Sequence, residues 1–331
     1  MGILLSKENN VEDREMRTVY ASFLKEKFDK GQPVMALDAD LMFASGIRGI
    51  SENYPNNIIE CGIAEANMIG VAAGLSMEGK IPFTHSFGVF SSRRVCDQVF
   101  ASCAYAKLNV KVIGSDPGIA STLNGGTHAA NEDIAIMRAI PEITIVEPTD
   151  SVMFRKILDL AVDTYGTFYI RLFRGAARKI YMESSNFKLG KSVLIRSGTD
   201  VTIIACGIEV AEAIDAAKIL ETEGISACVL DMFTIKPLDT EAVITAAKET
   251  GAIVTAENHN VIGGLGGAVA ETLAENYPVP MERIGIKDIF GEVGQFDYLK
   301  HKFELTAEDI VKKAEKAISR KNKYLSTTIS K

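Results

Sequence analysis

Short apolar segments alternate with longer stretches of helical pattern over most of this chain, and this alternation is the feature that most constrains its fold. Several of the apolar segments are apolar nearly throughout, as expected for strands covered on both faces. Strands that alternate with helices form parallel sheets with helices packed on both sides. We therefore predict an α/β protein with doubly wound, mainly parallel sheets.

A polar, weakly periodic segment over residues 177–192 divides the alternation into two series. Before it, the pattern predicts the strands Val34–Leu37, Asn57–Cys61, Ile81–Thr84, Val110–Ile113, Ile143–Val146 and Phe168–Leu172. The helices predicted there are Val11–Lys30, Ala64–Met77, Arg93–Ala106 and Ser151–Thr164, with another near Glu132. After it, the predicted strands are Val201–Cys206, Ala227–Leu230 and Ala252–Ala256. The predicted helices of this second series are Ile208–Glu223, Thr240–Thr250, Gly264–Glu275 and Ala307–Ser319.

The length of 331 residues exceeds that of most single domains, which agrees with two series of elements. We predict a first domain over residues 12–176, a linker over 177–192, a second domain over 193–319 and a flexible tail over 320–331.

Composition excludes several classes of protein. The formal net charge of −7 argues against a chain-wide nucleic-acid interface. No apolar run approaches the ~20 residues that a membrane span needs, and the first residues lack the apolar region of a signal peptide. The five cysteines are scattered without CxxC spacing, which is typical of reduced thiols and predicts neither disulfides nor a zinc site. We predict a cytoplasmic protein that contributes no metal ligands of its own.

The segment between the strand Val110–Ile113 and the helix near Glu132 is long and rich in glycine, serine and asparagine. Loops of this length in compact domains are usually functional or disordered. In an open α/β sheet, ligands bind next to loops that follow the carboxyl ends of strands. We expect this loop to line a binding site.

Glu65 stands in the first turn of a predicted helix that follows a strand ending near Cys61. A glutamate at such a position is ordinarily an exposed residue that interacts with the helix dipole. Here Ile63, Met68 and Ile69 make the start of the helix apolar on more than one side. Partial desolvation disfavours the charged form of a carboxyl, so Glu65 is a candidate for a protonated, functional acid.

Several blocks, in order and at matching spacing, resemble the transketolase family over about residues 12–319. The blocks are GIAEANM (62–68), HSFGVFSSRRVCDQV (85–99), GGTHAANEDIAIMRAIPEITIVEPTD (125–150), YIRLFRG (169–175), ENHNVIGGLGGAVAE (257–271) and DIFGEVGQFDYL (288–299). The resemblance identifies the pyrimidine-binding and C-terminal domains, that is, the C-terminal section of a split transketolase. It implies transfer of a two-carbon glycolaldehyde unit from a ketose, a sugar phosphate in the ordinary case, to an aldose.

The resemblance implies thiamine diphosphate as the cofactor. It assigns Glu65 as the catalytic acid that hydrogen-bonds the aminopyrimidine ring, and Ile63, Phe87 and Phe90 as cofactor contacts. From the pattern alone, core packing is the favoured interpretation of two phenylalanines at this spacing. In many family members another aromatic follows Phe90, and Arg93 and Arg94 stand in that neighbourhood here.

The resemblance also implies substrate contacts for His128, Arg174 and Asp40. Outside that context, a lone histidine is more often structural, and an arginine such as Arg174 often forms a surface ion pair. The loop departs from the family pattern at two positions: Asp116 replaces a histidine and Asn124 replaces an acid. These substitutions change charge and hydrogen bonding near the substrate, so we expect a donor that differs from the usual pentose phosphates.

The motif that binds diphosphate and Mg²⁺ in this enzyme class, Gly-Asp-Gly followed by an asparagine, is missing. The nearest string, Gly198-Thr199-Asp200, leads into a predicted strand. We therefore expect a partner, a transketolase N-terminal-section subunit, to share the cofactor and to bind Mg²⁺, in an α2β2 heterotetramer. The cluster Gly263–Gly267 suggests a phosphate loop, but close packing of a helix against a sheet or a second subunit is the favoured interpretation.

Three alternatives stay open. The chain could be the beta subunit of a 2-oxo acid dehydrogenase first component, a fragment of a deoxyxylulose-phosphate synthase, or a non-catalytic paralogue that acts as a binding subunit. The segments THAANEDIAIMR and RLFR fit transketolase better than the two other enzymes. Glu65 argues against the non-catalytic paralogue, which would not need that carboxyl.

Overall fold

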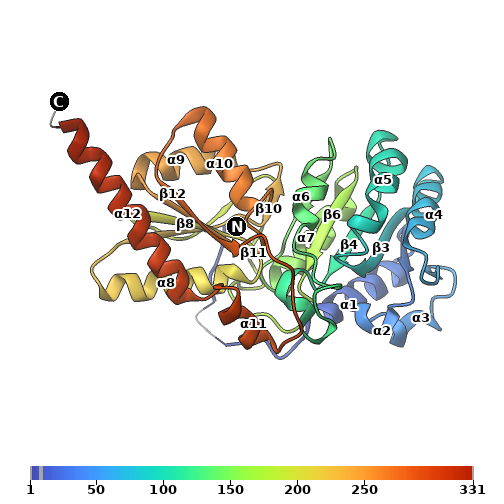
Figure 1. Ribbon diagram of the computed structural model, residues 1–331. Helices are drawn as coiled ribbons and strands as arrows, with labels where there is room; N and C mark the ends of the chain where they lie inside the picture. Colours follow the sequence, from blue (N-terminus) through green and yellow to red (C-terminus); the bar gives the residue numbers. More distant parts are fainter. Residues whose placement is uncertain (1, 7–9, 330–331) are drawn as a thin grey trace.

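The computed structural model describes residues 2–6 and 10–329, which form two α/β domains side by side (Figure 1). The first domain is built on a seven-stranded sheet and the second on a five-stranded sheet, with helices on both faces of each. All strand pairs inside the first domain are parallel, and the second sheet has one antiparallel edge. The predicted fold class is confirmed.

The first sheet contains all six strands that the sequence predicted for the first domain. They are β1 (Val34–Asp38), β2 (Ile58–Glu60), β3 (Ile81–Phe87), β4 (Lys111–Ser115), β5 (Thr144–Val146) and β6 (Phe168–Leu172). Their order in space, with β10 from the second domain at one edge, is β10-β5-β6-β4-β3-β1-β2. The chain thus moves from β1 to one side for β2 and to the other side for β3. This reversal makes a crevice at the carboxyl ends of β1 and β3, the usual place for ligands in such sheets.

The helices of the first domain differ from prediction mainly after β3. They are α1 (Met16–Asp29), α2 (Met42–Ser45), α3 (Arg48–Ser51), α4 (Glu65–Met77), η1 (Arg93–Val95), α5 (Cys96–Gln98), η2 (Val99–Tyr105), η3 (Gly118–Asn124), α6 (Asp133–Arg138) and α7 (Ser151–Asp163). The helix predicted over Arg93–Ala106 is present, but as a 3₁₀ turn, a short α segment and a π segment in succession rather than as a regular α-helix. The Ser92 hydroxyl donates to the Gly88 carbonyl at 2.6 Å, a local bond that competes with regular helix at its start.

The second sheet has the order β12-β11-β8-β9-β7. Its strands are β7 (Val193–Arg196), β8 (Val201–Ala205), β9 (Ala227–Asp231), β11 (Ile253–Asn260) and β12 (Met281–Ile286). Its helices are α8 (Glu209–Thr222), α9 (Thr240–Thr250), α10 (Leu265–Asn276), α11 (Phe296–Lys302) and α12 (Ala307–Ile329). The sequence pattern did not predict β7, β12 or α11.

Helix α12 runs along the outside of the second domain (Figure 1). It reaches Ile329, so the first part of the segment that we predicted as a flexible tail is helical. Residues 330–331 of that segment lie outside the described residues.

Strand β10 (Thr234–Lys236) ties the two domains together. It follows β9 in the chain but pairs antiparallel with β5, so the second domain supplies the edge strand of the first sheet. The segment predicted as a linker is also packed: Tyr181 and Phe187 are buried against each other and against Phe233, next to β10. The sequence did not predict β10, because its pairing depends on β5, about 90 residues earlier in the chain.

Arg171 on β6 forms a fully buried ion cluster at the junction of the domains. Its Nε donates to Asp133 at 2.9 Å and its Nη1 donates to Glu147 at 2.7 Å. Its Nη2 donates to the carbonyl of Asn258 on β11, in the second domain, at 2.6 Å. Burial raises the pKa of the Glu147 carboxyl, and the neighbouring Arg171 charge opposes that shift. The Arg171 side chain therefore compensates the charges of two buried acids and connects the two sheets by a hydrogen bond.

We predict that Arg171→Met strongly destabilises the chain, because it leaves Asp133 and Glu147 buried without their cation. Breaking a buried ion pair costs about 3–5 kcal/mol. The control is Arg196→Met, which removes an exposed pair with Glu221 and should change stability by less than about 1 kcal/mol. Urea unfolding followed by circular dichroism measures both variants. Equal unfolding midpoints for the two would contradict the role assigned to Arg171.

Candidate active site at the carboxyl edge of the first sheet

The predicted site residues all lie on segments that follow the carboxyl ends of the first domain's strands. Asp40 follows β1, Glu65 begins α4 after β2, Phe87 ends β3, Asp116 follows β4 and Arg174 follows β6. Because these strands are parallel, the segments meet at one edge of the sheet.

Glu65 is buried at the first position of α4, with 2% of its surface exposed. Its Oε1 accepts a hydrogen bond from Arg94 Nη1 at 2.7 Å, and the Ser86 hydroxyl lies 3.5 Å away. Its Oε2 is buried and, among the described residues, has no hydrogen-bond partner. The predicted desolvation of Glu65 is therefore confirmed. The arginine was not expected, because the residues next to Glu65 in the sequence predicted apolar surroundings.

Three rings form an aromatic cluster beside Glu65. The imidazole of His128 lies with its ring centroid 6.0 Å from that of Phe87 and 5.3 Å from that of Phe90. Both phenylalanines are only half-buried, so core packing does not account for them fully. Together with Arg93, Arg94 and Thr127, Phe90 and His128 line an open hollow of about 540 Å³. The two phenylalanines and the histidine are thus brought together as the sequence indicated.

Arg174 and Asp116 form an ion pair on the other side of Phe87. The guanidinium carbon of Arg174 lies 5.4 Å from the centroid of the Phe87 ring. Asp116 is buried, and burial raises the pKa of its carboxyl to about 6, against the opposing effect of Arg174. Arg174 does form an ion pair, as the alternative interpretation held, but its partner is a buried acid of the candidate site.

Hydrogen bonds at the domain junction fix the position of the long loop of the first domain that carries Asp116 and His128. The side-chain amide of Asn258 on β11 accepts from Ile119 N and donates to the Pro117 carbonyl, both at 2.9 Å. Arg171 donates to the carbonyl of Ala130 at 3.3 Å, two residues beyond His128. The position of this loop therefore depends on the domain junction.

Three predicted residues stand apart from this cluster. Asp40 is exposed, and its backbone N–H donates to Glu60 at 2.8 Å. Ile63 is 76% exposed. Asn124 is exposed at the end of η3. None of these three side chains has a hydrogen bond or ring contact with the cluster within the described part of the chain, so their assigned roles stay predictions.

Sequence reasoning missed a buried acid and histidine in the crevice between β1 and β3. Asp38 accepts from the Ser45 hydroxyl at 2.9 Å, and its Oδ2 lies 3.6 Å from Nδ1 of His85. Neither ring nitrogen of His85 has a hydrogen-bond partner among the described residues. The signal was available in LDADL: Asp38 directly ends an apolar strand, whereas Asp40, the residue that we selected, lies beyond it.

The glycine cluster Gly263–Gly267 packs closely, as the favoured interpretation held. The N–H groups of Leu265 and Gly266, at the start of α10, donate to the buried carboxyl of Glu257 at 2.6 and 2.8 Å. A Cβ on Gly264 would lie 2.0 Å from that carboxyl. A carboxyl group does lie at this helix start, and it belongs to a side chain of the sheet itself.

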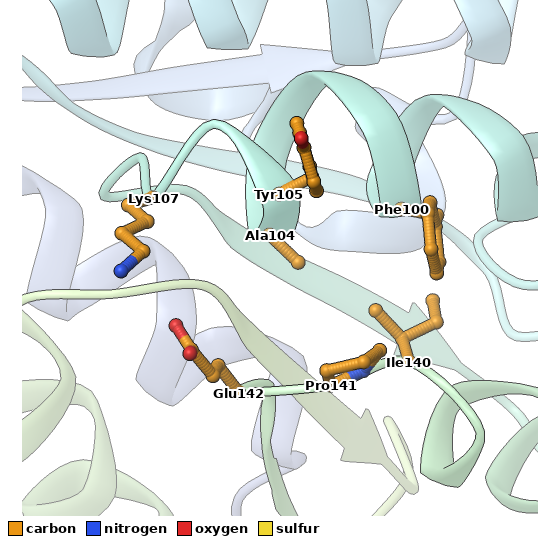
Figure 2. A pocket seen from close by; sticks show the side chains of 7 residues that line it. All are labelled: Phe100, Ala104, Tyr105, Lys107, Ile140, Pro141 and Glu142. Atoms are coloured by element: carbon orange, nitrogen blue, oxygen red, sulfur yellow. The ribbon is translucent and has the colours of Figure 1, made fainter.

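Another hollow, of about 420 Å³, lies at the opposite, amino-end edge of the first sheet (Figure 2). Figure 2 shows Lys107 and Glu142 at one end of it and Phe100 and Ile140 at the other. It contains none of the predicted site residues.

Within residues 2–6 and 10–329, no helix combines the length and apolar character needed to cross a bilayer. The same residues contain no group of three or more histidine, cysteine, aspartate or glutamate side chains placed to hold a metal ion.

Comparison with known proteins agrees with the geometry. The model of the transketolase pyrimidine-binding domain matches residues 12–179, and that of the transketolase C-terminal domain matches residues 190–310. A 6-deoxy-6-sulfo-D-fructose transketolase subunit from Clostridium sp. (strain MSTE9) is 55% identical, over 95% of this chain and 98% of its own length. One of the subunits of an apulose-4-phosphate transketolase from Phocaeicola vulgatus is 40% identical, over 82% of this chain and 87% of its own length.

A solved structure described as a split gene transketolase, inactive β4 tetramer, is 41% identical and superposes with a TM-score of 0.86. The match covers 93% of this chain and 99% of that one. The domains, the relatives and the structure agree: the chain belongs to the transketolase family, as the C-terminal section, or beta subunit, of a split transketolase.

Proposed function

We propose that this chain is the catalytic C-terminal subunit of a split transketolase that transfers a glycolaldehyde unit from a ketose to an aldose. It acts with an N-terminal-section subunit in an α2β2 complex, in the cytoplasm. The observation that carries the proposal is Glu65, a buried carboxyl beside two half-buried phenylalanines, one of whose oxygens has no hydrogen-bond partner in the described part of the chain.

The residues present fit the aminopyrimidine ring of thiamine diphosphate. Buried polar atoms are almost always hydrogen-bonded, so the unpartnered Glu65 Oε2 suits a ring nitrogen of a ligand. Phe87 and Phe90 offer apolar faces to a flat ring, and the exposed Ile63 lies just before α4, the helix that Glu65 begins. When bound, thiamine diphosphate supplies the carbon nucleophile that attacks the ketose carbonyl. The partner would hold the diphosphate and Mg²⁺, for which this chain lacks the motif.

Each residue of the cluster then has a defined task. Glu65 exchanges a proton with the ring nitrogen that it holds. His128, half-exposed over Phe90, donates or accepts hydrogen bonds at the sugar hydroxyls. Arg174 binds the anionic end of the donor, and Asp116 sets how much positive charge Arg174 presents. Asp40 and Asn124 lie further out, where they would contact the rest of the sugar or the partner.

The donor that we propose is a ketose with a sulfonate, such as 6-deoxy-6-sulfo-D-fructose, the compound that the 55% identical relative is named for. A phosphate monoester carries a charge of about −1.5 to −2 at neutral pH, whereas a sulfonate carries a single charge. The Asp116 carboxylate beside Arg174 reduces the local positive charge. A site with this balance is better matched to a monoanion than to the dianion of an ordinary pentose phosphate.

Reconstitution with an N-terminal-section subunit tests this function. We expect the isolated chain to be inactive and the complex to prefer 6-deoxy-6-sulfo-D-fructose over xylulose 5-phosphate and apulose 4-phosphate. Coupled assays of kcat/KM measure the preference. Turnover of xylulose 5-phosphate at about 10⁴ M⁻¹ s⁻¹ or above would show that the loop substitutions leave ordinary specificity intact.

The pH dependence of donor binding tests the pairing of Asp116 and Arg174. The Asp116 carboxyl, with its pKa raised to about 6 by burial, is neutral at lower pH and charged at higher pH. The KM for a sulfonate donor should therefore rise as the pH passes upward through about 6, because the charged carboxylate competes for Arg174 and repels the donor.

In the Asp116→Asn variant we expect that rise to disappear and the KM at about pH 8 to fall roughly three- to tenfold, since one nearby like charge is removed. A sulfonate is the right probe because phosphate itself titrates near pH 6. An uncharged ketose serves as the control and should show no change. The same pH profile in both proteins would rule out this role.

Glu65→Gln tests the catalytic acid. Glutamine keeps the size of the side chain but does not exchange a proton with the ring nitrogen, so we expect activity to fall by about 10²–10⁴-fold. The fold should survive, because the helix-dipole interaction and the half-exposed pair with Arg94 are each worth at most about 1 kcal/mol. Turnover of the complex and hydrogen–deuterium exchange at C2 of the bound cofactor measure the effect. Exchange at the wild-type rate would make Glu65 a helix-end carboxylate only.

A further inference from the structure

Arg94 makes two contacts that single it out from the basic residues around the site. Its Nη1 donates to Glu65 Oε1 at 2.7 Å, and its guanidinium carbon lies 4.0 Å from the centroid of the Phe90 ring. These are two of the groups that we assign to the cofactor ring, the hydrogen-bonding acid and an aromatic face. The neighbouring Arg93 does neither, because its Nε pairs with Glu132 at 2.8 Å.

A guanidinium is flat, donates N–H bonds in its plane and stacks on aromatic rings. It therefore offers Glu65 and Phe90 the same kinds of contact as an aminopyrimidine. Flat groups in contact lie about 3.5–4 Å apart, so a ring inserted between Arg94 and Phe90 would require about twice that separation. At 4.0 Å, Arg94 and a cofactor ring cannot both lie on this face of Phe90.

We propose that Arg94 holds the place of the cofactor's aminopyrimidine in the chain without its partner, and that it leaves Glu65 and Phe90 when the cofactor enters. This inference rests on the proposed function, because it takes Glu65 and Phe90 as cofactor contacts.

The arrangement has a physical reason. Glu65 is 2% exposed, and without Arg94 the nearest donor to its carboxyl is the Ser86 hydroxyl at 3.5 Å. A buried carboxylate without a charged or strong hydrogen-bonding partner is costly. Arg94 compensates the charge until the cofactor arrives. The Arg94 side chain is itself 44% exposed, so it can move into solvent without leaving a buried cation unpaired.

Calorimetry on the reconstituted complex, at saturating Mg²⁺, tests the proposal by measuring the dissociation constant of thiamine diphosphate. We expect Arg94→Met to bind the cofactor roughly three- to tenfold more tightly than the wild type, because no half-exposed ion pair has to be broken. The control is Arg196→Met, which removes a partly exposed ion pair with Glu221 in the second domain, away from the hollow, and should bind as the wild type does. Unchanged or weaker binding by Arg94→Met overturns the proposal, and weaker binding would mean that Arg94 supports Glu65 in the loaded site.

Thermal unfolding of the chain alone supplies a second measurement. Arg94→Met should lower the unfolding midpoint, and adding Glu65→Gln should restore much of the loss, because the uncompensated charge is gone. An unchanged midpoint in Arg94→Met would overturn the pairing. A wild-type complex that binds no thiamine diphosphate refutes the proposed function itself. A wild-type complex that binds it, with no gain in Arg94→Met, refutes only the inference about Arg94.

Discussion

The buried guanidinium of Arg171 is the interaction on which the candidate site depends. It balances Asp133 and Glu147 within the first domain and donates to Asn258 of the second. The side chain of Asn258 in turn holds the backbone at Pro117 and Ile119. The loop that carries Asp116 and His128 is therefore placed by contacts between the domains rather than by its own sequence. A buried cluster of this kind is stable only when every member is paired, so the loss of one partner destabilises the whole cluster.

Charge compensation by arginine recurs across the site. Glu65 and Asp116 are both buried carboxyls at the carboxyl edge of the sheet, and each contacts an arginine that is itself partly exposed. The ring of Phe90 contacts Arg94 and the ring of Phe87 contacts Arg174, and both rings lie close to the imidazole of His128. In this arrangement the charge of each buried acid is compensated by an arginine that is itself in contact with solvent. A ligand with suitable donors can replace an arginine there without uncovering an isolated charge, which suits a site completed by another subunit.

The strands of the first domain were predictable because they are covered on both faces, so their sequences are apolar nearly throughout. The same rule was less useful for the edge strands, because β7 has only three apolar residues before Arg196, and Glu282 and Arg283 interrupt the apolar pattern of β12. The helix predicted after β3 is present but irregular, and it begins as a 3₁₀ turn where the Ser92 hydroxyl bonds to the Gly88 carbonyl. Strand β10 was not predicted, because its partner β5 lies about 90 residues earlier in the chain.

By itself, the sequence determined the fold class, the family and the identity of most site residues, because apolar alternation and ordered motifs are local properties of the chain. It placed Glu65, Phe87, Phe90, His128 and Arg174 in motifs, but their contacts depend on segments that meet only when the parallel strands align. Only the tertiary structure revealed that Arg94 pairs with Glu65, that Asp116 pairs with Arg174, and that Asp38 rather than Asp40 is buried with His85. Which side chains compensate a buried charge is decided by distance and desolvation, and both arise from packing between elements far apart in sequence.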